Sequence, residues 1–169
     1  MLIGFYVNSE PDSFDIKQLS GVTISQENDT DFHIVGNTST LTLIHVVEQL
    51  LYKPGGYMSN DVLPPFLLID NIKSWEFGVL EQVRDYTAIM RQEFSRSQTQ
   101  SPEDVDIAKA EPLFNFDHNQ WIFPASENKF AEGLEFLKSY QLRLADKNNQ
   151  TGHFYARADN LALWLKRIE

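Results

Sequence analysis

Residues 53–106 read KPGGYMSNDVLPPFLLIDNIKSWEFGVLEQVRDYTAIMRQEFSRSQTQSPEDVD, and this stretch decides the fold that we expect. Its first part, residues 55–72, is rich in glycine, proline and turn-forming polar residues, which predict a shaped connection. Apolar residues then recur at roughly 100° per residue, as on the buried side of an amphipathic helix. They are Trp75, Val79, Val83, Tyr86, Met90 and Phe94. With Ser74 as an N-cap, the pattern predicts a helix from Trp75 to about Ser95.

The sequence before this stretch predicts another helix and an arm. Residues 39–52 carry their apolar side chains on one side, Thr38 or Ser39 can cap them, and the Pro-Gly-Gly run from Pro54 ends the pattern. Residues 8–38 alternate only weakly and predict an extended arm or linker. Residues 1–7, MLIGFYV, are too few to span a bilayer, which takes roughly 20 residues. We assign them to the remnant of a membrane anchor, the alternative being a frayed start or a short edge strand.

Three more helices are predicted after the 75–95 helix. The run SPED at residues 101–104 puts a proline at the first helical position, so we expect a short helix that ends before Pro112. Ser126 opens a longer helix, to about Lys147. Four of its apolar residues are in line: Phe130, Leu134, Leu137 and Leu144. The final helix carries apolar residues at heptad-like spacing: Phe154, Ala158, Leu161, Leu165 and Ile168.

These patterns predict a mostly α-helical fold, an irregular helical bundle with a short extended N-terminal arm and long aromatic-rich loops. Residues 39–169 form the helical domain, with four main helices and a short fifth. The stretch before Ser126 has no clean period and is expected to lie on the core through its rings. Those rings belong to Phe114, Phe116, Trp121 and Phe123.

Composition excludes several classes of function. A formal charge of −10 over 169 residues repels a phosphate backbone, so we expect no nucleic acid partner. The chain has no cysteine, which excludes thiol catalysis, thiolate metal sites and disulfides. Its four histidines show no ligand spacing, and we predict neither a metal site nor a cofactor.

Two groups of charged residues on the predicted 75–95 helix allow either a functional or a structural interpretation. Glu93 falls on the apolar side, where a partly desolvated carboxyl could be a general acid, or its stem could simply reach solvent or an arginine. Arg84, Arg91 and Arg96 could form a fork for carboxylate or phosphate groups. The alternative for these arginines is internal salt bridges, such as Glu81 with Arg84.

Three aspartates lie among turn-forming residues: Asp61, Asp70 and Asp117. Two of them could flank a sugar bond as acid and base, which requires carboxyl groups about 5 to 10 Å apart. The alternative is that each accepts a hydrogen bond in a turn or cap.

Four runs carry a resemblance to a known family. They are KPGGYMSNDVLPPF (53–66), IDNIKSWEFGVLEQVRDY (69–86), FSRSQTQSPEDVDIAKAEPLFNFD (94–117) and FYARADNLALWL (154–165). From about Leu2 to its end the chain resembles the bacterial domain-of-unknown-function family numbered twenty-three thirty-three. The resemblance implies anchoring in the bacterial inner membrane by a single N-terminal helix missing from this chain, with this domain in the periplasm. It nominates motif residues as candidates without a known activity: Asp61, Trp75, Glu76, Arg84, Asp85, Arg96 and Asp117.

Our functional hypothesis is a non-catalytic envelope module that presents the loops around residues 55–66 and 115–123 to another envelope protein. The expected binding surface comprises Tyr57, Asp61, Phe66, Trp75, Arg84, Arg96 and Trp121. The alternative is a carboxylate-based hydrolase or lyase acting on cell-wall glycan, with Asp61, Glu93 and Asp117 as its candidate catalytic residues. A third hypothesis, a small-molecule sensor, requires an apolar pocket with a few polar groups.

Overall fold

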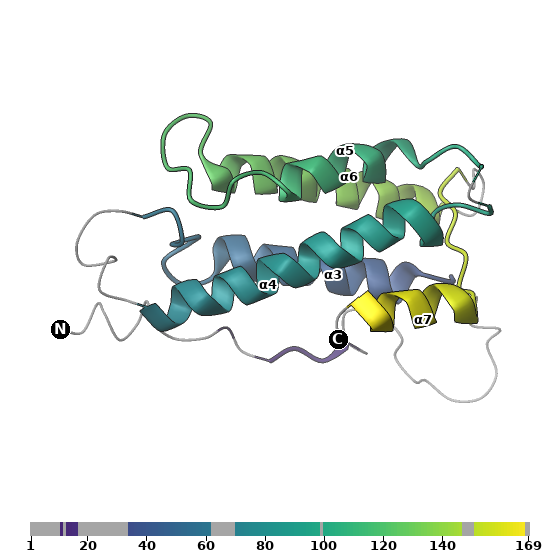
Figure 1. The fold of residues 1–169 in the computed structure, drawn as a ribbon, viewed down its shortest axis with the longest axis horizontal. Coiled ribbons are helices and arrows are strands. Elements are labelled where there is room, and N and C mark those ends of the chain that lie inside the picture. The colour runs from purple at the N-terminus through teal and green to yellow at the C-terminus, as the bar shows by residue number, and fades with distance from the viewer. Residues whose placement is uncertain are drawn as a thin grey trace.

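The computed structural model describes residues 11, 13–16, 34–61, 70–98, 100–146 and 151–167. Their helices follow in the order α3 (Asn37–Tyr52), α4 (Asp70–Ile89), the π-helical turn η2 (Met90–Phe94), α5 (Val105–Phe114), α6 (Ser126–Ala145) and α7 (Ala158–Arg167) (Figure 1). The described residues contain no strand. The predicted mostly α-helical bundle is therefore confirmed.

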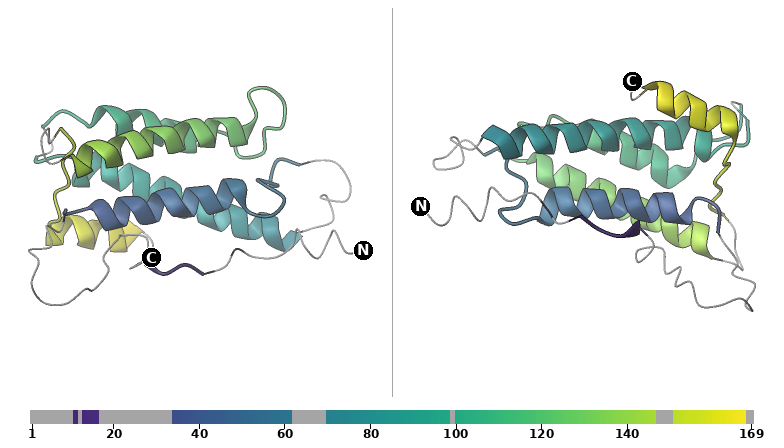
Figure 2. Two further views of the ribbon diagram at one scale, coloured as in Figure 1. Left: turned by 180° about the vertical axis from the view of Figure 1, so that it is seen from behind. Right: turned by 90° about the horizontal axis from the view of Figure 1, so that it is seen from below.

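Four of the helices run lengthwise and enclose one core. α5 packs along α6, α3 packs against α6 and α4, and α4 also contacts α5. α7 lies on the far side of α4 from α5 and α6, as both the front and the rear views show (Figures 1 and 2). The bundle therefore has two ends, and each end is built from the connections between helices.

The core is filled by the side chains that the helical patterns marked as apolar. All four in-line residues of α6 are buried, and the ring of Phe130 packs edge to face with Tyr57 at 5.4 Å and stacks with Phe114 at 6.5 Å. The largest fully buried apolar side chains come from the four helices α3, α4, α5 and α6, from η2 and from the connection after α3. They are Tyr140, Phe114, Phe130, Leu50, Met58, Ile72, Leu80, Met90, Ile107, Leu134 and Leu137. Burial of such side chains supplies most of the stabilisation of a bundle.

α3 begins two residues before the predicted start. Its N-cap is Gly36, at φ 84°, a left-handed conformation that glycine adopts without steric cost. Ser39 and Thr40 each donate a hydroxyl hydrogen bond to the carbonyl of Gly36, so Ser39 lies in the first turn and is not the cap. The predicted stop is confirmed, because α3 ends at Tyr52 and two glycines with positive φ follow.

α4 begins at Asp70, five residues before the predicted start, and Ser74 lies inside the helix and is not its cap. Ile72 explains the difference, since it is only 2% exposed and packs with Met58 and Trp75. The polar neighbours of Ile72 concealed this buried position in the sequence. The C-terminal end follows the prediction, but its last turn is the π-helix η2, in which Ser95 N–H donates to the carbonyl of Met90.

α5 lies later in the chain than predicted. Pro102 is outside the helix, and Asp104 is the N-cap because its side chain accepts from the N–H groups of Asp106 and Ile107 at 3.0 and 3.3 Å. The helix continues through Pro112 to Phe114, although the sequence predicted that it would end before Pro112. Tertiary hydrogen bonds explain the extension, since Arg84 donates to the carbonyl of Phe114 at 2.8 Å.

The prediction for the last helix was wrong in one respect. Phe154 precedes α7, in an extended segment, and its ring stacks on Phe94 with centroids 4.9 Å apart. Tyr155 N–H in the same segment donates to the carbonyl of Phe94 at 2.7 Å, so this pairing holds the chain out of the helix. Ile168, residues 1–7 and most of the predicted arm at 8–38 lie outside the described residues, and the expectations for them stay predictions.

Two helical glycines give a matched test of the core packing. A Cβ atom on Gly133 in α6 would lie 3.0 Å from the fully buried ring of Phe114, whereas a Cβ on Gly78 in α4 would meet nothing within 4 Å. We expect Gly133→Ala to lower the free energy of unfolding by about 1 to 3 kcal/mol. Gly78→Ala should raise it by about 0.5 to 1 kcal/mol, because alanine has the higher helix propensity.

Urea unfolding followed by circular dichroism measures both changes. Equal stabilisation by the two substitutions would contradict the close packing of α6 against α5.

Candidate functional site

The two predicted functional loops meet at one end of the bundle. The connection that follows α3 and the loop between α5 and α6 both lie at the left of Figure 1. Two contacts join them, because Tyr57 Oη donates to the carbonyl of His118 and Asn60 Nδ2 donates to the carbonyl of Gln120, each at 3.1 Å. Asn60 Nδ2 also donates to Glu127 Oε2, in the first turn of α6, at 2.6 Å. We call this part of the molecule the loop end.

A buried ion pair holds the first of these loops. Lys53, the first residue after α3, pairs through Nζ with Glu76 Oε1 of α4, and both side chains are completely buried. Lys53 Nζ also donates to the carbonyl of Gly56, which closes a tight turn. Two charges taken out of water in this way are tolerated only when they are paired and hydrogen-bonded.

Glu76 takes its remaining hydrogen bonds from the same loop. Met58 N–H donates to Oε1 at 2.9 Å, and Ser59 Oγ donates to Oε2 at 2.5 Å. One carboxylate therefore binds three groups of the connection: the ammonium of Lys53, the backbone N–H of Met58 and the hydroxyl of Ser59. The loop from Lys53 to Asn60 is consequently fixed to α4.

Ser126 organises the second loop. Its Oγ lies 2.6 Å from the carbonyl of Asp117 and 2.9 Å from that of Gln120, and it accepts from Gln120 N–H at 3.0 Å. Asp117 Oδ1 accepts from Asn119 N–H at 3.0 Å, which is an aspartate turn. Ser126 is the first residue of α6 and its side chain is completely buried, so these hydrogen bonds hold residues 117–120 in a compact turn.

The outer part of this loop is a run of three exposed apolar residues. Trp121 is 55% exposed, Ile122 62% and Phe123 90%. We call residues 121–123 the apolar tip. The prediction that the rings of this stretch lie on the core was wrong for Trp121 and Phe123, although it holds for Phe114 and Phe116. The reason is that Ser126 and the two contacts from Tyr57 and Asn60 hold the backbone of residues 117–120, which leaves the following side chains outside.

The predicted binding surface is brought together only in part. Trp121 is exposed as expected, but Tyr57 is buried, and burial raises the pKa of its hydroxyl. Trp75 is half-buried against the core, and Phe66 lies outside the described residues. Phe77 was not predicted, yet it is 44% exposed and its ring lies 5.1 Å from that of His118, beside the second loop.

The arginines are structural, and the predicted internal salt bridges are confirmed. Arg84 pairs with Glu81 at 2.6 Å and donates to the carbonyls of Phe114 and Phe116. Arg91 pairs with Glu103 and Glu111 at 2.8 Å, and Arg96 donates to the carbonyl of Ser101 at 2.9 Å. Arg91 and Arg96 converge on the carboxylate of Glu103, at 2.8 and 3.8 Å, so the acid that they share is internal, whereas Arg84 binds the loop after α5.

The carboxylate candidates are divided between the two ends of the bundle. Asp117 is exposed and accepts within its turn, as the structural alternative predicted, and Glu93 is half-buried in η2 at the opposite end of α4. The side chain of Asp70 lies outside what the structure describes. Asp61 is half-buried at the loop end, where Lys73 Nζ donates to its carbonyl at 2.9 Å.

Sequence reasoning missed the central pair of the loop end. Glu76 was nominated only through the family resemblance, and Lys53 was not nominated. The available signal was position, since Glu76 lies four residues from the buried positions Ile72 and Leu80 and therefore on the same side of the helix.

Two searches of the described residues bear on function. They contain no group of three or more histidine, aspartate or glutamate side chains placed to hold a metal ion. In the same part of the chain, none of the helices combines the length and the apolar character needed to cross a bilayer.

Comparison with known proteins gives one match. A family model described as "Uncharacterized protein conserved in bacteria (DUF2333)" covers residues 1–169. Neither a curated protein nor a solved structure matches the chain.

Replacement of one member of the buried pair tests its role. Lys53→Met should lower the free energy of unfolding by about 3 to 5 kcal/mol, because Glu76 is left charged and buried. The double variant with Glu76→Gln, which keeps an acceptor for Met58 and Ser59, should recover more than half of this loss. Lys138→Met, which breaks an exposed pair with Glu48, serves as the control and should cost less than about 1 kcal/mol.

Denaturant unfolding of the parent, of Lys53→Met, of Glu76→Gln, of their double variant and of Lys138→Met measures these energies. Additive losses in the double variant would show that Lys53 and Glu76 are not coupled.

Asp61 gives the loop end a pH dependence. Burial raises the pKa of its carboxyl above the ordinary value of 3.8, with Lys73 opposing the shift. The folded state therefore holds this proton to a higher pH than the unfolded state, so the stabilising contribution is present below the ordinary pKa and is lost as the pH rises through the raised value. Asp61→Asn, which stays neutral, should be more stable than the parent near pH 7, and this advantage should shrink on acidification.

The urea midpoints of both proteins, measured from about pH 7 down to about pH 4, check the sign. An advantage of Asp61→Asn that grows toward low pH would contradict it.

Proposed function

The chain belongs to the DUF2333 family of uncharacterised proteins conserved in bacteria, and from this premise we propose that it is a non-catalytic envelope module that binds another envelope protein through its loop end. The observation that carries the proposal is the apolar tip, residues 121–123, exposed on a loop whose backbone is held from inside. Exposed contiguous apolar side chains typically mark interaction sites.

Preorganisation supports this use of the tip. Ordering a loop on binding costs free energy, and that cost is reduced where the loop is already fixed. Here Ser126, Tyr57 and Asn60 hold the loop before any partner arrives. Two of the three tip residues are aromatic, and aromatic side chains are common energetic centres of protein interfaces.

Charge indicates the kind of partner surface. The chain carries a formal charge of −10, and the exposed Asp117 lies close to the tip in sequence. We infer a partner with an apolar pocket for the tip and basic residues around it, since opposite potentials favour encounter and register.

We further propose that this domain faces the periplasm and is held at the inner membrane by an N-terminal helix. The family resemblance supports this location. The absence of cysteine from the chain is compatible with an oxidising compartment, where a free thiol can mispair.

Site-specific photo-crosslinking in cells tests the interaction. A photoreactive phenylalanine analogue at position 123 of the anchored full-length protein should give one discrete adduct, whereas the same analogue at Leu142 should not. Leu142 is a matched control because it is an apolar residue of α6, 67% exposed and outside the tip. Trp121→Ser should abolish the adduct without a loss of stability.

The captured protein is then purified and its affinity measured directly. Phe123→Ser should weaken binding at least about tenfold, or about 1.4 kcal/mol, and Leu142→Ser should leave it unchanged. Equal effects of the two substitutions, or adducts of equal yield from both positions, would refute the proposed surface.

The natural lack of cysteine allows a clean test of location. Leu142→Cys supplies the only thiol of these 169 residues. In a full-length protein with any other cysteine replaced by serine, it should react with a membrane-impermeant maleimide in cells whose outer membrane has been made permeable. Labelling only after lysis of the inner membrane would contradict a periplasmic domain.

A further inference from the structure

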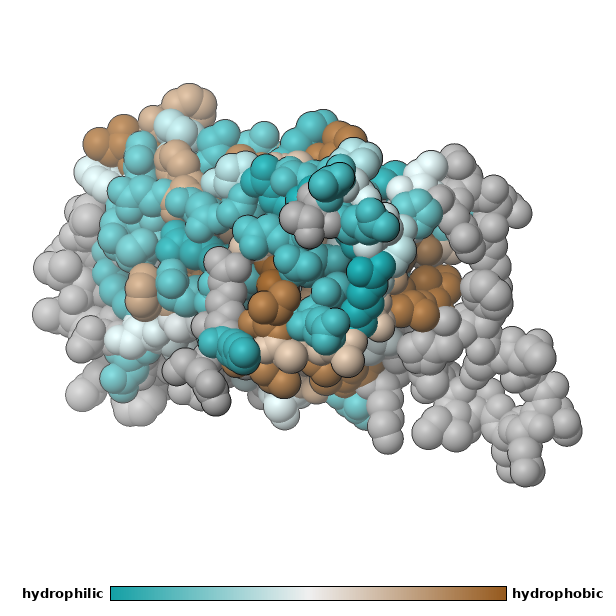
Figure 3. Space-filling model, turned by 45° about the vertical axis from the view of Figure 1, so that its right-hand side comes forward, coloured by the Kyte–Doolittle hydropathy of each residue, from teal (hydrophilic) through white to brown (hydrophobic). Residues whose placement is uncertain are grey.

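An apolar groove runs between α3, α4 and α7, away from the loop end. Its main part has a volume of about 570 Å³, and an adjoining part of about 320 Å³ shares the walls formed by Tyr86, Phe154 and Trp164. Figure 3 brings the end that carries α7 forward, and it shows hydrophobic residues gathered in the lower part of a largely hydrophilic face. Pockets for small ligands commonly have volumes of about 300 to 1,000 Å³.

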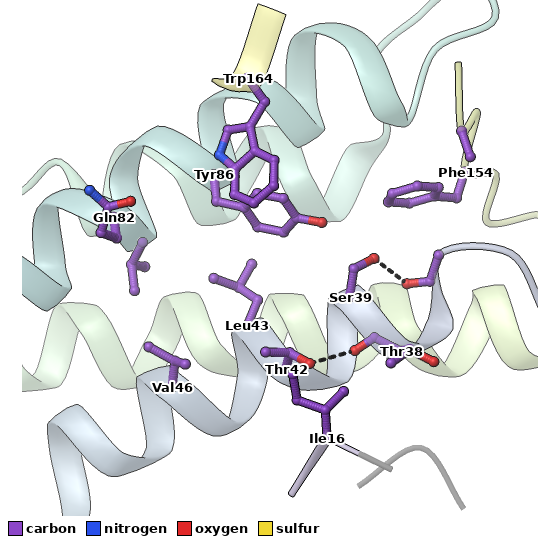
Figure 4. A pocket seen from close by; sticks show the side chains of 13 residues that line it. Ile16, Thr38, Ser39, Thr42, Leu43, Val46, Gln82, Tyr86, Phe154 and Trp164 are labelled. Carbon is purple, nitrogen blue, oxygen red and sulfur yellow. Dashed lines mark hydrogen bonds between the residues drawn. The ribbon is translucent and has the colours of Figure 1, made fainter. Parts of the chain in front are cut away.

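The walls of the groove present carbon almost throughout. Leu43 and Val46 of α3 line one side, and Val83 and Tyr86 of α4 line the other. Figure 4 shows the threonine and serine side chains of α3 along the same wall. The hydroxyls of Thr42 and Ser39 are hydrogen-bonded to the backbone of the same segment, since Thr42 donates to the carbonyl of Thr38 at 2.8 Å and Ser39 to that of Gly36 at 3.0 Å. The groove therefore suits a hydrocarbon chain.

One polar atom in the groove is left without a partner. Trp164 Nε1 is a buried side-chain nitrogen, and no hydrogen-bond acceptor for it is found among the described residues. Its indole packs edge to face on Tyr86, with centroids 5.1 Å apart, and Figure 4 shows the nitrogen on the side of the ring toward Gln82. An unpaired buried donor costs about 1 to 3 kcal/mol. Indole N–H is a donor only, so a ligand that completes it must bring an acceptor.

A positive charge lies where the groove ends. Among the described residues, no charged side chain lines the larger part, but Arg157 lines the smaller part together with Trp164. Arg157 Nη2 donates to the carbonyl of Ser97 at 2.6 Å, which holds the guanidinium in place. In a chain of net charge −10, a groove with no acid and one arginine is complementary to a molecule with an anionic head and an apolar tail.

Helix α7, which covers the groove, leaves part of its own apolar side exposed to solvent. α7 places Asn160 and Trp164 against the protein, whereas Leu161 and Leu165, which the sequence predicted as its packing side, are 47% and 50% exposed. Asn160 Nδ2 donates to the carbonyls of Glu93 and Tyr155, and these bonds set the rotation of the helix. Leu161 consequently lines the smaller part of the groove and extends its apolar wall.

We propose that this groove binds a long-chain carboxylic acid. The hydrocarbon chain lies between α3 and α4, and the carboxylate accepts the hydrogen bond of Trp164 Nε1, while Arg157 in the adjoining part adds a positive potential. The ligand satisfies the one buried side-chain donor that has no partner in the described structure, and it covers the apolar walls of the groove.

Tryptophan fluorescence tests the proposal, because Trp164 is one of only three tryptophans in the chain. In this chain of 169 residues, Trp75→Phe with Trp121→Phe leaves Trp164 as the sole reporter. Titration with nitroxide-labelled stearic acid should quench it saturably, and unlabelled palmitic acid should reverse the quenching. The matched protein that keeps only Trp121, made by Trp75→Phe with Trp164→Phe, should not be quenched. Equal quenching of both proteins would overturn the proposal.

Calorimetry with palmitic acid tests the chemistry of the site. Trp164→Phe, which keeps the ring and removes the donor, should weaken binding about tenfold or more. Arg157→Ala should weaken it less, by an amount that falls as the salt concentration rises. Dodecylamine, an apolar chain with a cationic head, should not bind. Equal affinity for the acid and the amine would show non-specific adsorption and overturn the assignment.

A groove-filling variant separates the groove from other surfaces. Thr42→Phe adds a ring at the half-buried position on the α3 wall and should abolish binding, while the circular dichroism spectrum confirms that the protein is folded. Unchanged binding by folded Thr42→Phe would place the ligand elsewhere. If Thr42→Phe does not fold, the result with Trp164→Phe decides, since full affinity in that variant is equally incompatible with the site.

Discussion

The buried pairing of Lys53 with Glu76 is the constraint on which the loop end of this protein depends. Two completely buried side chains of opposite charge must meet, because either charge alone would be left without water or a counter-ion. Lys53 belongs to the chain that leaves α3, and Glu76 to the second turn of α4. The requirement that they meet therefore determines where the intervening connection starts and which backbone groups face α4.

The arrangement of the second loop follows from the first. With Lys53 and Ser59 bound to Glu76, the side chains of Tyr57 and Asn60 are directed to the carbonyls of His118 and Gln120. Those carbonyls belong to the loop that carries the apolar tip. A polar interaction inside the bundle thus positions an apolar surface outside it, which is the arrangement expected of a recognition loop on a rigid scaffold.

The opposite end of the molecule uses its apolar side chains differently. At the loop end the rings of the tip point outward, whereas Phe154, Tyr86 and Trp164 surround a hollow between helices. This hollow persists because hydrogen bonds of the last segment fix its path: Tyr155 N–H binds the carbonyl of Phe94, and Asn160 binds that of Glu93. Both acceptors lie in the π-helical turn, so the local irregularity of α4 sets the position of α7.

What the sequence determined by itself was the helical class, the position of most helices and the residues of the core, because 3.6-residue periodicity and the Gly-Gly stop of α3 are local signals. It also indicated correctly that Arg84 forms an internal salt bridge with Glu81, since the two residues lie three positions apart on one helix. Only the tertiary structure decided the ends of α4 and α5, the partner of Glu76, the exposure of the tip and the rotation of α7. Each of these depends on groups distant in the chain: Ile72 against Met58, the guanidinium of Arg84 on the carbonyl of Phe114, Lys53 on Glu76, and Asn160 on Glu93. A free energy of a few kcal/mol from such a contact exceeds the fraction of a kcal/mol by which local propensities usually differ, so the long-range contact prevails.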